Sequence, residues 1–130
     1  MQSTIYIISL LVNMAFAPNR LVSDLPDALI KAIENGNYGD LASHTSGKIE
    51  IVFPNTSGFY SREQASQMFS HFFTKNKPNV FIVTRYGKNG SSRYLRGTLR
   101  TQSGKYRVYV TFKTTDNQDY ELEGISFEEE

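Results

Sequence analysis

The sequence predicts an α+β domain in which N-terminal helices pack on the apolar face of a curved antiparallel sheet. Three observations lead to this prediction. Up to about residue 73, apolar residues recur at helical spacing; after Pro78 they alternate with polar residues; and the clearest of the later segments is apolar on one side only. The chain of 130 residues has the size of one domain with a single core.

The first elements are a short helix, a helical turn and a strand. Residues 23–26 supply cap residues and an early proline, and Gly36 is a residue at which a helix can end, so we expect a helix between them. A brief turn covers residues 39–43, and residues 48–53 alternate as in a half-buried strand. Residues 54–58 are expected to form a loop. The helix has one apolar face, made by Leu25, Leu29, Ala32 and Ile33.

The second long helix begins at a capping box. Ser61 at the N-cap and Gln64 three residues later can each satisfy a backbone N–H group that the helix cannot pair internally. Behind this start lies one wide apolar stripe, made by Ala65, Met68, Phe69, Phe72 and Phe73. His71 lies well away from the middle of the stripe and is expected to face solvent. The aromatic cluster is therefore interpreted as a surface that packs against the core.

The second half of the chain predicts a four-stranded antiparallel meander. The strands are expected at residues 80–86, 93–101, 105–114 and 118–127, joined by short, turn-rich segments. Gly124 interrupts the last alternation, which predicts a β-bulge there. The expected inward rows are Ile49, Ile51, Phe53, Val80, Ile82, Leu95, Gly97, Leu99, Tyr106, Val108, Val110 and Phe112.

Residues 1–17 are predicted to be an export signal, which would leave residues 18–130 as one domain in the periplasm or outside the cell. Residues 5–12 are almost entirely apolar, and Ala15-Phe16-Ala17 fits the small-x-small pattern that signal peptidase recognises. The stretch is too short to span a bilayer, which needs about 20 apolar residues. A buried N-terminal strand is the alternative.

The order helix, short helix, strand, helix and meander resembles the cone-shaped, cystatin-like architecture of nuclear transport factor 2-like proteins. Four segments are similar to a family of small exported bacterial domains of unknown function, typical of Bacteroidetes: GFYSREQA at residues 58–65, Phe72-Phe73, GTL at 97–99 and GKYRVY at 104–109. The resemblance covers residues 23–130. It implies a fold and an export signal, but no activity.

The sequence offers little material for catalysis. It has no cysteine, no nucleophile or nucleotide-binding motif, and no carboxylate in the expected inward rows. Its two histidines, His44 and His71, are not spaced as metal ligands on one element. We therefore expect no catalytic residue, no cofactor and no metal.

The expected function is non-catalytic binding of a small apolar ligand or of a protein partner. The alternative is a lyase or isomerase with Tyr60 or Tyr106 as proton donor at the mouth of the cone, by resemblance to superfamily members such as ketosteroid isomerases and dehydratases. The expected cavity wall for either function consists of Phe53, Tyr60, Phe69, Phe72, Tyr106 and Val108.

Charge is distributed unevenly along the chain, although the net charge is only +1. Residues 64–115 hold ten Lys or Arg and no acid, and residues 116–130 hold seven acids and no base. The outer sheet face would then carry Tyr94, Arg96, Arg107 and Tyr109, a surface that could bind anions. The favoured interpretation is simpler: Asp119, Glu121 and Glu123 on the last strand pair with Arg107 and its neighbours.

The charge balance and the outer sheet face also indicate which binding partners to expect. The near balance of charge argues against nucleic acid as a partner. The resemblance implies that this face could instead form a homodimer, and Tyr94 and Tyr109 would suit such an interface because aromatic residues are enriched at interfaces.

Overall fold

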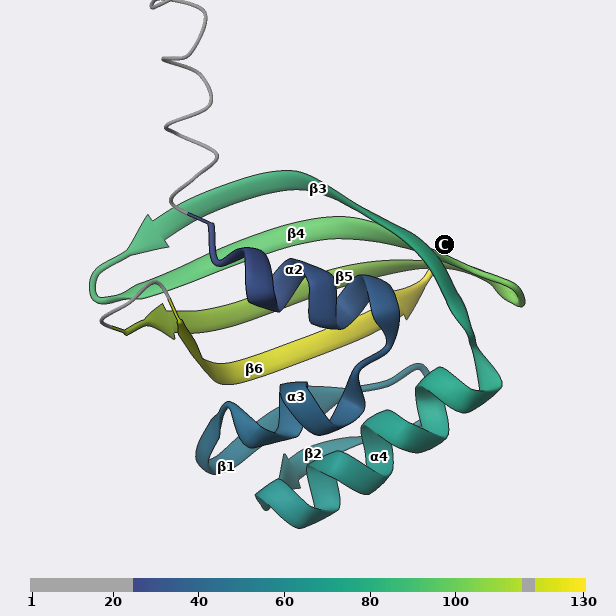
Figure 1. The fold of residues 1–130 in the computed structure, drawn as a ribbon, viewed down its shortest axis with the longest axis horizontal. Coiled ribbons are helices and arrows are strands. Elements are labelled where there is room, and N and C mark those ends of the chain that lie inside the picture. The colour runs from purple at the N-terminus through teal and green to yellow at the C-terminus, as the bar shows by residue number, and fades with distance from the viewer. Residues whose placement is uncertain (1–24, 116–118) are drawn as a thin grey trace, which may run out of the picture.

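A computed structural model describes residues 25–115 and 119–130 of the chain. It confirms the α+β prediction, because helices pack on a strongly curved sheet (Figure 1). The predicted export signal at residues 1–17 lies outside the described residues. The described elements are α2 (Asp27–Asn35), α3 (Tyr38–Ser43), β1 (Thr45–Val52), β2 (Ser57–Tyr60), α4 (Arg62–Lys75), β3 (Pro78–Asn89), β4 (Ser92–Thr101), β5 (Gly104–Thr114) and β6 (Tyr120–Glu129).

The sheet has six strands in the order β2-β1-β6-β5-β4-β3. The predicted meander is confirmed: β3 to β6 pair as antiparallel neighbours. β1 joins β6 in parallel, so the sheet is mixed rather than purely antiparallel. The expected loop is shorter than predicted, because Ser57 opens β2, which pairs with β1. The four residues of β2 do not alternate clearly between apolar and polar, so the sequence alone does not predict a strand there. They form a strand because their backbone pairs with that of β1.

α4 follows its sequence signals closely. The Ser61 hydroxyl accepts from the backbone N–H of Gln64 (3.2 Å), and the Gln64 side chain accepts from the backbone N–H of Ser61 (3.0 Å), which is the predicted capping box. Ala65, Phe69, Phe72 and Phe73 are buried, and Met68 is half-buried. His71 is exposed, as predicted. The stripe therefore faces the core, where it meets rings from the sheet.

The inward row of β5 is confirmed, since Tyr106, Val108, Val110 and Phe112 are all buried. In β3 the prediction for Ile82 is wrong: Ile82 is 48% exposed, and its neighbour Phe81 is buried. The pairing of β3 with β4 shifts register on both sides of this point, so the alternation cannot be extrapolated through it. A larger aromatic side chain takes the inward position.

The predicted irregularity at Gly124 is present. Thr111 pairs with Gly124 and the next residue, Phe112, pairs with Leu122, which leaves Glu123 as the extra residue of a bulge. The bulge keeps Leu122 and Ile125 on the buried face although they are three residues apart.

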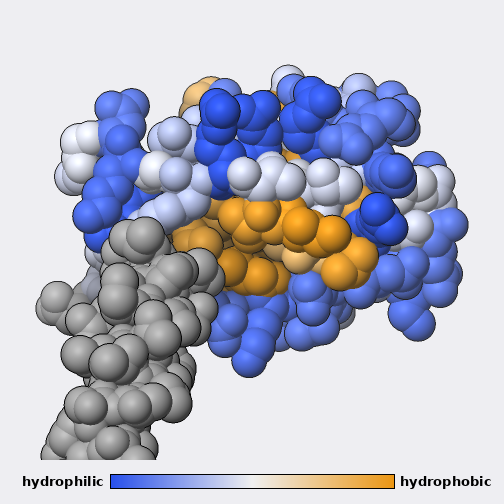
Figure 2. Space-filling view, turned by 90° about the horizontal axis from the view of Figure 1, so that it is seen from above, coloured by the Kyte–Doolittle hydropathy of each residue, from blue (hydrophilic) through white to orange (hydrophobic). Residues whose placement is uncertain are grey.

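β3 forms one edge of the sheet, and α2 lies along it. Glu34 of α2 accepts a hydrogen bond from the backbone N–H of Phe81 (3.2 Å), which occupies one of the edge amides. Seen from above, the surface shows an apolar area between hydrophilic flanks (Figure 2). Half-buried apolar residues of this part of the fold include Leu25, Ile30 and Val83.

Candidate functional site

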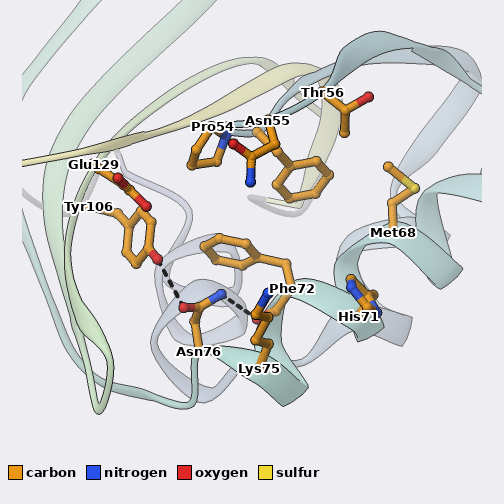
Figure 3. A pocket seen from close by; sticks show the side chains of 11 residues that line it. Pro54, Asn55, Thr56, Met68, His71, Phe72, Lys75, Asn76, Tyr106 and Glu129 are labelled. Atoms are coloured by element: carbon orange, nitrogen blue, oxygen red, sulfur yellow. Dashed lines mark hydrogen bonds between the residues drawn. The ribbon is translucent and has the colours of Figure 1, made fainter.

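A pocket of about 270 Å³ opens where α4 ends beside the sheet (Figure 3). Its walls come from α4, from the turn between β1 and β2, and from the neighbouring ends of β5 and β6. The lining residues are Phe53, Pro54, Asn55, Thr56, Met68, His71, Phe72, Lys75, Asn76, Tyr106 and Glu129.

The inner wall of the pocket is aromatic and rigidly packed. The ring of Phe72 lies 5.3 Å from that of Phe53 and meets that of Tyr106 edge-on at 5.1 Å. On its other side Phe72 contacts Phe127 at 4.4 Å, deep in the core. Such contacts add to the burial energy of each ring, so the wall is fixed before any ligand arrives.

One polar group lies deep in this pocket, the side-chain amide of Asn76. Its Oδ1 accepts from the hydroxyl groups of Tyr106 (2.9 Å) and Ser103, and its Nδ2 donates to the carbonyl of Phe72 (3.0 Å). Asn76 follows the last residue of α4, and its backbone N–H donates to the same carbonyl of Phe72 (2.8 Å), so Asn76 is tied to the helix end by two hydrogen bonds. The hydroxyl proton of Tyr106 is thereby committed to Asn76.

The rim of the pocket carries charge of both signs. His71 and Lys75 project from α4 on one side, and Glu129 stands at the end of β6 on the other (Figure 3). All three side chains are exposed, so water screens them. The pocket therefore combines an apolar wall with a wet, polar entrance.

Half of the expected cavity wall lies at this pocket. Phe53, Phe72 and Tyr106 line it, whereas Phe69 and Val108 are fully buried elsewhere in the core and Tyr60 is half-buried in β2. The sequence did not indicate the polar lining, because Asn76 and Glu129 come to the same pocket only through the packing of α4 against the sheet ends. The local signal available was an Asn directly after the helical pattern, a residue type that often ends helices.

A second group of titratable side chains surrounds His44. Its Nε2 lies 2.8 Å from Asp119 Oδ1, its Nδ1 lies 2.6 Å from the backbone carbonyl oxygen of Asp40, and its ring stacks on Tyr120 at 3.9 Å. Burial, followed by the carboxylates of Asp40 and Asp119, raises the pKa of the Tyr120 phenol. The predicted pairing of Asp119 with Arg107 or its neighbours is thus wrong, because Asp119 contacts His44 where β6 begins.

This group links two elements that are distant in the sequence. The side chains of Asp40 and Asp119 are 37% and 53% exposed, so neither is a buried acid. The contacts join the end of α3 to the start of β6. In the described parts of the chain, no cluster of three or more His, Asp or Glu side chains could hold a metal ion.

The outer face of the sheet presents the four residues expected there. Tyr94 and Tyr109 stack at 6.0 Å, and Arg96 lies directly opposite Tyr109. Arg107 forms ion pairs with Glu128 (3.9 Å) and Glu130 (3.7 Å) instead of Glu121 or Glu123, because the strand register places Glu128 opposite it.

One predicted acid of the last strand does pair on this face. Glu123 pairs with Lys113 at 3.9 Å, which agrees with the expectation that acids of the last strand pair with the basic neighbours of Arg107.

The described part of the chain contains no helix of the length and apolarity needed to cross a bilayer. A search of curated proteins gives no match to the chain.

Solved structures share the fold. A DUF4783 family protein from Bacteroides ovatus is 30% identical, with the match covering 82% of this chain and 96% of the other at a TM-score of 0.74. A second, from Bacteroides uniformis, is 27% identical over 81% of this chain and 96% of the other, with a TM-score of 0.73.

A nuclear transport factor 2 (NTF2)-like protein from Cytophaga hutchinsonii is 13% identical over 86% of this chain and 98% of the other, with a TM-score of 0.58. The fold predicted from the order of elements is thereby confirmed as NTF2-like. The sequence model of a domain of unknown function, DUF4783, matches residues 26–128, and the chain belongs to this DUF4783 family.

Proposed function

We propose that this domain binds a small ligand with an apolar body in the pocket at the end of α4, and that it performs no chemistry on that ligand. The observation that carries the proposal is the combination of a fixed aromatic wall with a polar group whose hydrogen bonds are already satisfied within the protein. The volume of about 270 Å³ lies near the lower end of the range for ligand pockets, which favours a compact ligand.

The arrangement of the titratable groups supports binding over catalysis. A general acid or base needs a group aimed at the substrate in a site that excludes water and tunes its pKa. Tyr106 directs its hydroxyl proton to Asn76, and His71 and Glu129 stand at the exposed rim. Tyr60, the other proton donor considered from sequence, does not line the pocket.

The test introduces a bulky side chain into the pocket and beside it. Met68 lines the pocket and is half-buried, so Met68→Trp should fill part of the space. Gln67→Trp places the same ring on the preceding residue of α4, which is exposed and does not line this pocket, and it serves as the matched control. The probes are indole and benzoate, followed by NMR chemical-shift titration, with circular dichroism to verify folding.

We expect shifts at Phe72 and Asn76 in the wild-type chain, a loss of affinity of at least about tenfold in Met68→Trp, and no change beyond about twofold in Gln67→Trp. Equal effects of the two variants would contradict the proposal. So would the absence of shifts at the pocket residues for every probe, since a preformed apolar pocket should accept at least one of them.

We also propose that the protein is exported and that the signal at residues 1–17 is cleaved. The support is the apolar stretch followed by Ala15-Phe16-Ala17. N-terminal sequencing of the protein from its native host should give a chain that starts at Pro18. A mature chain that still begins at Met1 would contradict cleavage.

A further inference from the structure

Three arginines of the outer sheet face lie around one surface hollow. Arg85 of β3, Arg96 of β4 and Arg107 of β5 line a depression of about 380 Å³, together with Thr84 and Thr98. We call this depression the arginine hollow. Arg96 and Arg107 also line a neighbouring hollow of about 370 Å³ that is bounded by Tyr109, Ser126 and Glu128. The two hollows therefore share a wall of two guanidinium groups.

Two of these arginines are placed against each other. Arg85 is the direct cross-strand partner of Arg96 in the pairing of β3 with β4. Like charges in directly opposite positions destabilise a sheet. Within residues 25–115 and 119–130, neither guanidinium group takes part in an ion pair. Two guanidinium groups that lie side by side without a carboxylate partner would both be stabilised by a bound anion.

The third arginine already has acidic neighbours, but its contacts are weak. Arg107 lies 3.9 Å from Glu128 and 3.7 Å from Glu130, and its own side chain is 51% exposed. Exposed pairs at such distances contribute about 0 to 1 kcal/mol. Glu130 also lines the arginine hollow, so one carboxylate of the chain itself sits beside the three arginines. A stronger anion could displace it.

We propose that the arginine hollow binds a phosphate or sulfate ester, with the ring that carries the ester resting against Tyr109 in the neighbouring hollow. Planar guanidinium groups bind tetrahedral oxyanions through paired, charge-assisted hydrogen bonds, and the hydroxyl of Thr98 can donate as well. The hydroxyl of Thr84 instead donates to the backbone carbonyl of Arg96 (3.1 Å). Tyr109 is 42% exposed and stacks on Tyr94, which presents a supported aromatic surface. The carboxylate of Glu130 competes with the ester for the same arginines.

This site is separate from the pocket at the end of α4. Alternation along the last strand sends Glu129 to that pocket and Glu128 and Glu130 to the hollows of the outer face. The proposal therefore goes beyond the proposed function, and each can fail without the other.

The test compares Arg96→Gln with Arg100→Gln. Arg100 lies two positions from Thr98 on the same strand and is exposed, but it lines neither hollow, so both variants remove one positive charge from one face. The probes are inorganic phosphate, inorganic sulfate and phenyl phosphate, measured by NMR titration at low and at moderate salt. A third variant, Glu130→Gln, removes the competitor.

We expect Arg96→Gln to weaken binding of each probe at least about tenfold, Arg100→Gln to change it less than about twofold, and Glu130→Gln to strengthen it about two- to fivefold. Phenyl phosphate should bind more tightly than inorganic phosphate, and Tyr109→Ala should abolish that preference. Arg85→Gln should weaken binding and raise the melting temperature, because it relieves the repulsion with Arg96.

Equal losses in Arg96→Gln and Arg100→Gln would overturn the proposal, because they would reduce it to a general charge effect. No binding of any probe by the wild-type chain would overturn it as well. If sedimentation then showed a dimer that Arg85→Gln dissociates, the acidic strand of a second copy would be the occupant in place of an ester.

Discussion

Among the glycines of the described residues, Gly97 is the one at which an added Cβ would lie closest to another atom, and replacing it by Ala tests the register of β3 against β4. An added Cβ would lie 2.5 Å from the backbone carbonyl oxygen of Ile82 and 2.7 Å from the ring of Phe81. Ordinary van der Waals contact begins at 3.4 Å. The clash involves a backbone atom of the neighbouring strand, so rotation of a side chain alone cannot relieve it.

The magnitude follows from the two ways in which the fold can respond. Either β3 moves away from β4, which strains their hydrogen bonds, or the buried ring of Phe81 leaves its place in the core. Overpacking of this kind costs about 1 to 3 kcal/mol, and exposing a Phe side chain costs about 1.5 to 3 kcal/mol. We expect Gly97→Ala to lower the free energy of unfolding by about 2 to 3 kcal/mol, or the melting temperature by roughly 8 to 12 °C.

The assay is urea unfolding followed by circular dichroism, with Gly39→Ala as the matched control. Gly39 lies in α3, and an added Cβ there meets no atom within 4 Å. The same chemical change should therefore stabilise the protein by about 0.4 to 1 kcal/mol, since Ala favours a helix over Gly. A loss of less than about 0.5 kcal/mol in Gly97→Ala would refute the reasoning, because the two strands would then have room that the structure denies.

Two further predictions concern the hydrogen-bonded and titratable tyrosines. Asn76→Ala leaves the buried Tyr106 hydroxyl without its acceptor and should lower the free energy of unfolding by about 1 to 3 kcal/mol, whereas Tyr106→Phe should lower it by about 0.5 to 1.5 kcal/mol. In urea unfolding, the double variant should lose less than the sum of the two single losses, because both remove the same hydrogen bond. Additive losses would argue against this hydrogen bond. The raised pKa of Tyr120 keeps the phenol protonated in the folded state, so its stabilising contribution is complete below about pH 10, the ordinary pKa of tyrosine, and is lost as the pH rises further. Tyr120→Phe should therefore reduce the alkaline loss of stability, measured as the change in free energy of unfolding between about pH 9 and pH 11. The exposed Tyr38→Phe should leave that loss unchanged, and the opposite ranking of the two variants would contradict the assignment.

Local patterns in the sequence were sufficient for most of the elements. The capping box of Ser61 and Gln64 involves residues three apart, and the apolar stripe of α4 repeats within single turns, so both can be recognised without knowing the fold. The alternation in β5 likewise assigns its buried face from one strand alone. The candidate site could be predicted only in part, as its aromatic wall, because aromatic residues on apolar faces are visible in the sequence and their polar neighbours are not.

What the sequence determined by itself was therefore the order and type of the elements other than β2, the faces of α4 and β5, and through them the NTF2-like architecture. Tertiary structure decided the parallel pairing of β1 with β6, the inward position of Phe81, the bond between Tyr106 and Asn76 across 30 residues, and the opposition of Arg85 to Arg96. The physical reason is that capping and periodicity act over a few residues, whereas strand register depends on bulges and on the packing of distant side chains. One shifted residue changes which groups meet.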